Sequence, residues 1–348
     1  KKKVAKKKVV SPKAPALGDL LEKVVSSELP TPATQAVAPV VAPLMKVSSV
    51  GYSAVPSKHA NFVPFGDFAD LKKIIDSGFF YPTFITGMSG NGKTFAVEQA
   101  AARADRELFR VNITVETDED DLLGGFRLVD GETRWFDGPV VEAMRRGAIL
   151  LLDEIDLASN RIMCLQPVLE GKPILLKKIN EIISPAEGFT IVATANTKGK
   201  GSDDGRYVGT NVLNDAFLER FAVTFEWEYP SAAVERKIIG GTLKNLGVPN
   251  KEYAEKLVTW AGITRQAFAE GVEQELIATR RLEKIAEAFA IFGDETKAVS
   301  LALNRFDDET KEAFLDLWEK VSGNEEIAPV TEDDIYQNDI EKGENVPF

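Results

Sequence analysis

The chain has 348 residues, more than one ordinary hydrophobic core serves, with 44% apolar side chains and a net charge of −12. No apolar run approaches the roughly 20 residues of a membrane-spanning helix. One histidine and one cysteine exclude an internal disulfide framework and a His/Cys site for a transition metal, and the single cysteine favours the reducing cytoplasm.

The N-terminal end of the chain differs in charge from the rest. The first 13 residues carry seven lysines and no acidic residue, and a Pro/Ala-rich stretch at 30–43 is typical of a semi-extended linker. We interpret residues 1–50 as a basic tail and linker with a short helix at 17–29. The basic run is either a solubilising tail, which we favour, or a docking segment for an acidic surface or for nucleic acid. Residues 323–348 are acidic and predict a second tail, and the acidic body argues against nucleic-acid binding.

Between the tails, strand-like and helical patterns alternate. Strand-like apolar runs lie at 83–86, 108–112, 149–153 and 189–195, and helical patterns lie at 94–104, 140–146 and 155–169. This alternation predicts a parallel sheet with helices on its faces, in an α/β domain at 51–230. From 231 to 322 the pattern is helical, which predicts a second, helical domain.

The strongest motif is GMSGNGKT at residues 87–94. It follows a strand-like run, precedes a helical one and matches the G-x-x-x-x-G-K-[ST] pattern of a phosphate-binding loop. Glycines let backbone N–H groups turn toward a phosphate chain, and the helix N-terminus adds a favourable dipole. Lys93 is predicted to reach the β- and γ-phosphates of ATP, and Thr94 to bind Mg²⁺. The predicted nucleotide-binding residues of the loop are Gly87, Gly90, Asn91, Gly92, Lys93 and Thr94.

Two acidic residues follow the next buried strand. Residues 148–156 read AILLLDEID, so the carboxyl end of the strand delivers Asp153 and Glu154 beside the phosphate loop. Asp153 is predicted to hold the Mg²⁺ shell with Thr94, and Glu154 to polarise the water that attacks ATP. An acidic pair alone is an ordinary loop start, but together with the phosphate loop it predicts hydrolysis.

A third strand ends on Asn196 and releases the chain into a loop with four glycines, ATANTKGKGSDDGRYVGT, at residues 193–210. Parallel sheets bind ligands at their carboxyl edge, so Asn196 is predicted to contact the γ-phosphate or the attacking water. Asn112, at the end of FRVN, either restrains Glu154 or simply ends its strand. The glycine loop is either a flexible link that passes the hydrolysis state to a neighbour or an unstructured insertion.

Arg220 lies in the segment NVLNDAFLERF, residues 211–221. The spacing of Leu213, Phe217 and Phe221 predicts one apolar helical face, with Arg220 toward the end of the helix. Arg220 is either an arginine finger for a neighbouring subunit's γ-phosphate or an ordinary cation at a helix C-terminus.

The segment ATRRLEKIAEAFAIFG, residues 278–293, predicts an amphipathic helix with Thr279 as N-cap and Gly293 as C-cap. Arg280 and Arg281 fall in its first turn, where the helix dipole disfavours cations, so a nucleotide phosphate is expected to compensate. The choice between the two arginines stays open. The expected buried face consists of Leu282, Ile285, Ala286, Phe289 and Phe292.

In this order, these motifs resemble the AAA+ ATPases. Residues 121–147, DLLGGFRLVDGETRWFDGPVVEAMRRG, look like the hairpin insertion of the MoxR/CbbQ branch, with Asp130 and Gly131 as its turn. The glycine loop after Asn196, the LNDAFLERF segment and ITRQAFAEG resemble the CobS family, the motor subunits of aerobic cobaltochelatase. The resemblance covers roughly residues 60–320.

The resemblance implies an α/β P-loop NTPase fold of the AAA+ type, with a parallel sheet flanked by helices, a hairpin insertion and a C-terminal helical lid. It implies an ATP- and Mg²⁺-dependent motor in a homo-oligomeric ring, expected to be a hexamer. The implied partners are a von Willebrand-type subunit with an adhesion site and a large chelatase subunit that holds the metal and the tetrapyrrole. The residues that match the family's nucleotide-handling positions are Lys93, Thr94, Asp153, Glu154, Asn196, Arg220 and Arg280.

Three other functions remain open at the level of sequence. A MoxR- or CbbQ-type activase would use the same motor on another protein client. A nucleic-acid motor would need pore-facing hairpin residues such as Arg127, Trp135 and Phe136, which are also suited to packing or to contacts with protein partners. A nucleotide-gated scaffold would hydrolyse little, and the presence of Glu154 argues against it.

Overall fold

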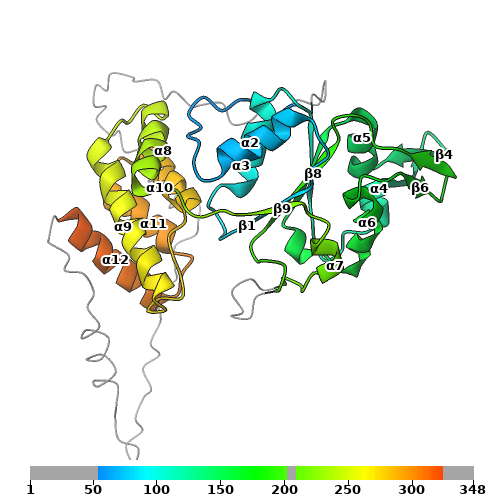
Figure 1. Ribbon diagram of the computed structural model, residues 1–348. Helices are drawn as coiled ribbons and strands as arrows, with labels where there is room; N and C mark the ends of the chain where they lie inside the picture. The colour runs from blue at the N-terminus through cyan, green and yellow to red at the C-terminus, as the bar shows by residue number, and fades with distance from the viewer. Residues whose placement is uncertain (1–53, 202–208, 324–348) are drawn as a thin grey trace, which may run out of the picture. The chain divides into compact units, whose positions relative to one another are not determined.

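The computed structural model of the chain describes residues 54–201 and 209–323. Within these ranges it contains an α/β part followed by a helical part (Figure 1). The predicted tails, the linker, the helix at 17–29 and residues 202–208 of the glycine loop lie outside the described residues. In the described ranges, no helix is long and apolar enough to cross a membrane.

The α/β part is built on a five-stranded parallel sheet in the order β2-β5-β8-β1-β9. Its strands are β1 (Thr83–Thr86), β2 (Leu108–Asn112), β5 (Ile149–Asp153), β8 (Thr190–Ala195) and β9 (Val223–Glu226). Every residue of β1, β5 and β8 is buried, as expected for parallel strands that are covered on both faces. The predicted α/β fold is therefore confirmed, although the prediction lacks β9, whose burial is only partial.

Alternate residues of β5 contribute to two separate cores, because successive side chains of a strand point to opposite faces. Ile149 and Leu151 pack with the helices of one face, and Leu150 and Leu152 with those of the other. The first face is covered by α2 (Phe68–Ser77) and α3 (Lys93–Arg103), and the second by α5 (Pro139–Arg146), α6 (Gln166–Leu169) and α7 (Asp215–Leu218). This layering leaves the carboxyl ends of β1, β5 and β8 together at one edge of the sheet.

Two antiparallel hairpins lie beyond α5 and the short helix α4 (Glu119–Leu123) (Figure 1). In the first, β3 (Gly124–Val129) pairs with β4 (Glu132–Asp137). Its turn is made by Asp130 and Gly131, both with positive φ, as predicted. The second, which the sequence analysis lacks, pairs β6 (Ile174–Leu176) with β7 (Glu181–Ile183).

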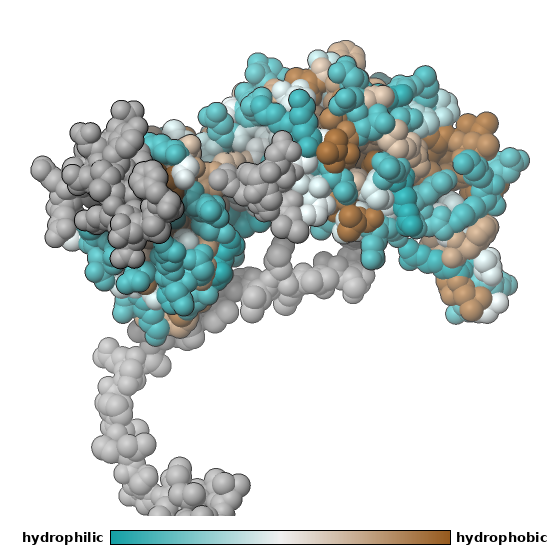
Figure 2. Space-filling view, turned by 90° about the horizontal axis from the view of Figure 1, so that it is seen from below, coloured by the Kyte–Doolittle hydropathy of each residue, from teal (hydrophilic) through white to brown (hydrophobic). Residues whose placement is uncertain are grey.

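Arg145 of α5 joins the two hairpins, because its guanidinium lies 2.8 Å from Asp137 of β4 and 2.7 Å from Glu181 of β7. The hairpins expose large apolar side chains, and Figure 2 shows apolar surface gathered at this end of the molecule. Trp135 instead packs half-buried against the core, whereas Arg127 lies over the exposed ring of Phe136. The exposed apolar residues of the hairpins include Phe126, Leu128, Phe136, Leu175 and Ile182.

The helical part has a core of its own, centred on Tyr253, Trp260 and Trp318. The ring of Trp318 lies 5.8 Å from both of the other two rings, in edge-to-face geometry. Its helices are α8 (Ala232–Asn245), α9 (Lys251–Ala269), α10 (Thr279–Phe292), α11 (Glu295–Leu303) and α12 (Asp308–Ser322).

The predicted helix at 155–169 is wrong as a single element. The chain instead forms two 3₁₀ segments, η1 (Ile155–Leu157) and η2 (Asn160–Leu165), before α6 begins. Glu154 is left-handed, Ala158 is extended, and Pro167 has no backbone N–H to continue a helix. This irregular stretch therefore returns from the sheet edge without forming a long helix.

The helix before Arg220 is shorter than predicted. The side chain of Asn214 accepts from the N–H of Ala216 and starts α7 at Asp215, so Leu213 precedes the helix and Arg220 follows it. The three apolar residues of the predicted face are nevertheless buried, namely Leu213, Phe217 and Phe221.

Two details of α10 also differ from the prediction. Thr279 is not the N-cap, because Ala278 occupies that position and the hydroxyl of Thr279 bonds to Glu235 instead. Phe292 is 48% exposed, with Lys297 over its ring. The left-handed C-cap Gly293 is as predicted.

Candidate active site

The phosphate loop, residues 87–94, connects β1 to α3 at the carboxyl edge of the sheet. Its first glycine admits no side chain, because a Cβ at Gly87 would lie 2.1 Å from the carbonyl oxygen of Trp227. The amide of Asn91 donates to the same carbonyl oxygen. The buried side chain of Asn91, predicted to contact nucleotide, thus ties the loop to the residue that follows β9.

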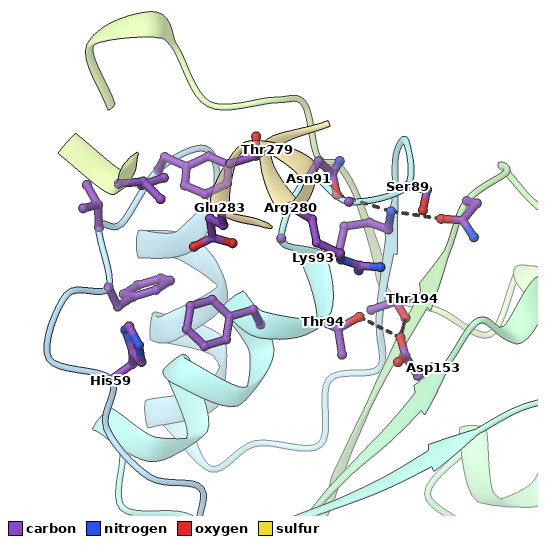
Figure 3. Close-up of a pocket in the computed structure, with 18 of the residues that line it drawn as sticks. His59, Ser89, Asn91, Lys93, Thr94, Asp153, Thr194, Thr279, Arg280 and Glu283 are labelled. Carbon is purple, nitrogen blue, oxygen red and sulfur yellow. Dashed lines mark hydrogen bonds between the residues drawn. The ribbon is translucent and has the colours of Figure 1, made fainter. Parts of the chain in front are cut away.

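The ammonium group of Lys93 lies inside this loop. Its Nζ donates to the carbonyl oxygens of Gly87 at 2.6 Å and Met88 at 2.8 Å. It also lies 3.3 Å from Oδ1 of both Asn91 and Asn196 (Figure 3). The loop thus holds a cation, and a positive charge at this place fits the phosphates of a nucleotide.

Burial lowers the pKa of Lys93 to about 8 because it disfavours the charged form. The carboxylates of Asp156 and Asp153 oppose this decrease, whereas the positive charge of Arg280 adds to it. A phosphate anion beside Nζ would stabilise the charged form of the lysine.

Both carboxylate oxygens of Asp153 accept hydrogen bonds. Its Oδ1 accepts from the hydroxyl of Thr94 at 2.7 Å and from that of Thr194 (Figure 3). Its Oδ2 accepts from Nε of Arg110 at 3.0 Å, and Arg110 also pairs with Glu98. Hydroxyl and carboxylate oxygens are ligands that Mg²⁺ prefers, so Thr94 and Asp153 fit a magnesium site. Neither Arg110 nor Thr194 was predicted from the sequence.

Glu154 follows directly and has an uncommon backbone conformation, with φ 58° and ψ 44°. Such left-handed residues other than glycine concentrate at functional sites. The N–H of Glu154 donates to the hydroxyl of Thr194 at 3.3 Å, and its exposed side chain lines the cavity. Among the described residues, no hydrogen bond joins Glu154 to Asn112, whose Cα is paired with that of Asp153 across β2 and β5.

Asn196 is positioned by Asp156, a fully buried carboxylate that the sequence analysis did not single out. Its Oδ2 accepts from the N–H groups of Asn196 and Thr197, both at 2.9 Å, and from the hydroxyl of Thr197. The carbonyl of Asp156 accepts from the N–H of Asn211 at 2.7 Å, beyond the glycine loop. One acidic side chain therefore fixes the end of β8.

Part of this set lines one cavity of about 340 Å³ (Figure 3). Its polar end holds Lys93, Thr94, Asp153, Glu154 and Asn196, whereas Arg110 and Asp156 are not part of the lining. The other end is apolar and aromatic, as a site for a nucleotide base requires. Its signal in the sequence is HANFVPFG, residues 59–66, which the sequence analysis did not use. The residues of the apolar end are Phe62, Val63, Phe65, Phe95 and Ile238.

The two arginines at the start of α10 lie in different places. Arg280 lines the same cavity as Lys93, and its N–H donates to the carbonyl of Gly90 at 3.2 Å (Figure 3). Arg281 does not line that cavity; it borders a second cleft with Arg305 and Glu275, and Arg280 lines both. The geometry thus favours Arg280 as the arginine that reaches a phosphate.

Arg220 does not line this cavity. Its Nε donates to Glu170 at 2.8 Å, and its guanidinium also bonds to the carbonyl of Ala216. Hydrogen bonds from Lys172 and Arg220 lower the pKa of Glu170. The structure therefore places Arg220 apart from the other predicted site residues of its own chain.

Comparisons of the amino-acid sequence agree with a nucleotide-binding site of the AAA type. Residues 82–221 match the family model described as "AAA domain (dynein-related subfamily)". The chain is 31% identical over 250 residues to the aerobic cobaltochelatase subunit CobS of a Sinorhizobium species, covering 69% of this chain and 75% of that protein. It is 33% identical over 224 residues to protein NorQ of Paracoccus denitrificans, covering 60% and 78%. A solved RuvB structure from Thermotoga maritima aligns over 68% of this chain and 67% of that chain, with a TM-score of 0.45 and 15% identity.

Two substitutions separate binding from turnover at this site. We expect Lys93→Ala to weaken ATP binding at least about tenfold, because the loop loses its only buried ammonium among the described residues. Glu154→Gln should bind ATP but hydrolyse it about 10²-fold more slowly, because an amide cannot accept the proton of the attacking water. Calorimetric ATP titration and phosphate release measure the two effects.

The matched control is Glu187→Gln, which removes an exposed carboxylate outside the cavity and should leave both quantities unchanged. Equal turnover in the wild-type protein and in Glu154→Gln would contradict the assignment of Glu154 as the base.

Proposed function

This chain belongs to the MoxR-like branch of the AAA+ ATPases, and on that premise we propose that it is the motor subunit of a chelatase that inserts cobalt into a tetrapyrrole. The observation that carries the proposal is the 31% identity to CobS over 250 residues. That alignment is longer than the AAA match at 82–221, so the likeness extends beyond the nucleotide-binding segment.

The chain is an ATPase, and we assign a separate role in hydrolysis to each residue of the site. Bound Mg²⁺, held by Thr94 and Asp153, would neutralise charge on the β- and γ-phosphates. Lys93 binds the phosphate oxygens, and Glu154 accepts a proton from the attacking water at its carboxylate. Asn196, fixed through its backbone by Asp156, orients the water or the γ-phosphate.

We further propose that Arg220 completes the site of a neighbouring subunit in a homo-oligomeric ring, expected to be a hexamer. Its place outside its own chain's cavity supports this role. An arginine supplied across a boundary stabilises the charge that develops on the transferred phosphoryl group. The pair with Glu170 keeps the guanidinium ordered until a phosphate competes for it.

The proposed partners are a von Willebrand-type adhesion-site subunit and a large subunit that holds the metal and the tetrapyrrole. Their support is the likeness to a named cobaltochelatase subunit. The composition agrees with a metal site on another subunit, because one histidine and one cysteine give this chain few ligands for cobalt. The exposed apolar residues of the hairpins suit contacts with protein.

The second candidate is a MoxR-type activase that remodels a different protein client. The 33% identity to NorQ favours it, because that identity is as high as the identity to CobS. A nucleic-acid motor is less favoured, since the chain has a net charge of −12.

Mixed rings test the role of Arg220. Arg220→Ala subunits keep an intact phosphate loop, and Lys93→Ala subunits keep an intact finger, so a mixture should regain part of the ATPase activity that each lacks alone. We expect recovery of roughly a quarter of wild-type activity at equal ratio, because about one boundary in four pairs two intact elements. Verified mixed rings without recovery would rule out a finger that acts across the boundary.

The client is tested by adding candidate partners to the purified ATPase. The adhesion-site and large chelatase subunits should together raise ATP turnover several-fold and support cobalt insertion, which Glu154→Gln should abolish. Single- and double-stranded DNA should leave turnover unchanged, since the acidic body gives no footprint for nucleic acid. Strong stimulation by DNA, with indifference to both subunits, would overturn the chelatase proposal.

A further inference from the structure

The segment ITRQAFAEG, which the sequence analysis singled out, contains an arginine that the nucleotide cavity does not use. Arg265 of α9 forms a two-pronged ion pair with Glu235 of α8, with N···O distances of 2.8 and 3.0 Å. Its Nε donates at 2.8 Å to the carbonyl of Ile277, two residues before α10 begins. Glu235 is 1% exposed, so this is a buried pair.

A third group completes the pair. The hydroxyl of Thr279 donates to Oε1 of Glu235 at 2.6 Å. A buried carboxylate is costly unless its oxygens are all satisfied, and here Arg265 and Thr279 together satisfy them. Thr279 is the first residue of α10 and immediately precedes Arg280.

Two sets of contacts connect this cluster to the phosphate loop. At one end the guanidinium of Arg265 lies 4.1 Å from the ring centre of Tyr229, whose hydroxyl donates to the carbonyl of Ser89 at 2.8 Å. At the other end the N–H of Arg280 donates to the carbonyl of Gly90 at 3.2 Å. Of these two adjacent carbonyl groups, that of Gly90 is bonded directly to α10, and that of Ser89 is connected to α9 through Tyr229.

The start of α10 depends on these contacts because its ordinary stabilisers are missing. Ala278 provides no side-chain cap, and the first turn has no acidic residue but holds two arginines, which the helix dipole disfavours. The carboxylate of Glu235 and the carbonyl of Gly90 supply the acceptors instead. A Cβ at Gly90 would lie 2.8 Å from that of Ala278, so loop and helix are in close contact.

We propose that Thr279, bonded to the Glu235–Arg265 pair, is the positioning residue that aims Arg280 at the nucleotide phosphates. The hydroxyl fixes the first turn of α10 to the rest of the lid, so that Arg280 keeps its place on the cavity wall. This inference rests on the proposed contact between Arg280 and the phosphates.

The test compares Thr279→Val, which removes the hydroxyl, with Thr279→Ser, which keeps it. Losing a hydrogen bond to a charged group should cost about tenfold in ATP turnover for Thr279→Val, whereas Thr279→Ser should stay within about twofold of wild type. If Thr279 acts through Arg280, Thr279→Val and Arg280→Ala should change kcat and KM for ATP in the same proportion. In an Arg280→Ala background, adding Thr279→Val should change nothing further.

Thermal unfolding and a matched control separate positioning from folding. Thr190→Val removes another buried hydroxyl, at the start of β8 and therefore at the end of that strand away from Asn196. It should leave turnover unchanged. Equal losses in Thr279→Val and Thr279→Ser, or a full further loss in the Arg280→Ala background, would overturn the positioning role alone. An Arg280→Ala variant with wild-type turnover would overturn the proposed role of Arg280 itself, and the positioning role with it.

Discussion

The buried ammonium of Lys93 is the charge around which the site is organised. Its Nζ donates to two backbone carbonyl oxygens of the phosphate loop and lies near the amide oxygen of Asn196, the residue that follows β8. Burial makes the charged form costly, as its pKa of about 8 indicates, and the nearby carboxylates Asp153 and Asp156 offset part of that cost. A triphosphate in the loop would offset the rest of the cost of burying this charge. Nucleotide binding should therefore stabilise the charged form of Lys93.

The carboxylates that balance Lys93 also fix the catalytic geometry. Asp153 accepts from Thr94 and Arg110, and Asp156 accepts from the backbone of Asn196. Each acidic side chain thus compensates a buried charge and holds a residue proposed to act on the phosphates. The lid shows a similar arrangement, because buried Glu235 accepts from the hydroxyl of Thr279, the residue directly before the arginine that lines the cavity.

The sequence predicted the parts of the site that depend on local pattern. The apolar runs of β1 and β5, and the residues at their carboxyl ends, follow from strand burial and from the phosphate-loop spacing. The parts that it missed depend on contacts between distant segments. Arg110 lies 43 residues from Asp153, and Asp156 lies 40 from Asn196, so no local pattern marks either pair. Arg280 and Arg281 looked equivalent for the same reason, because only the cavity distinguishes them.

The most direct test of this account is backbone hydrogen exchange of the Glu154→Gln protein, with and without ATP and Mg²⁺. If loop and lid close on one nucleotide, amides of residues 87–94 and 279–283 should gain protection together, with the same dependence on ATP concentration. Lys93→Ala should remove both effects. Protection of the phosphate loop while residues 279–283 exchange as in the free protein would contradict a cavity shared by Lys93 and Arg280.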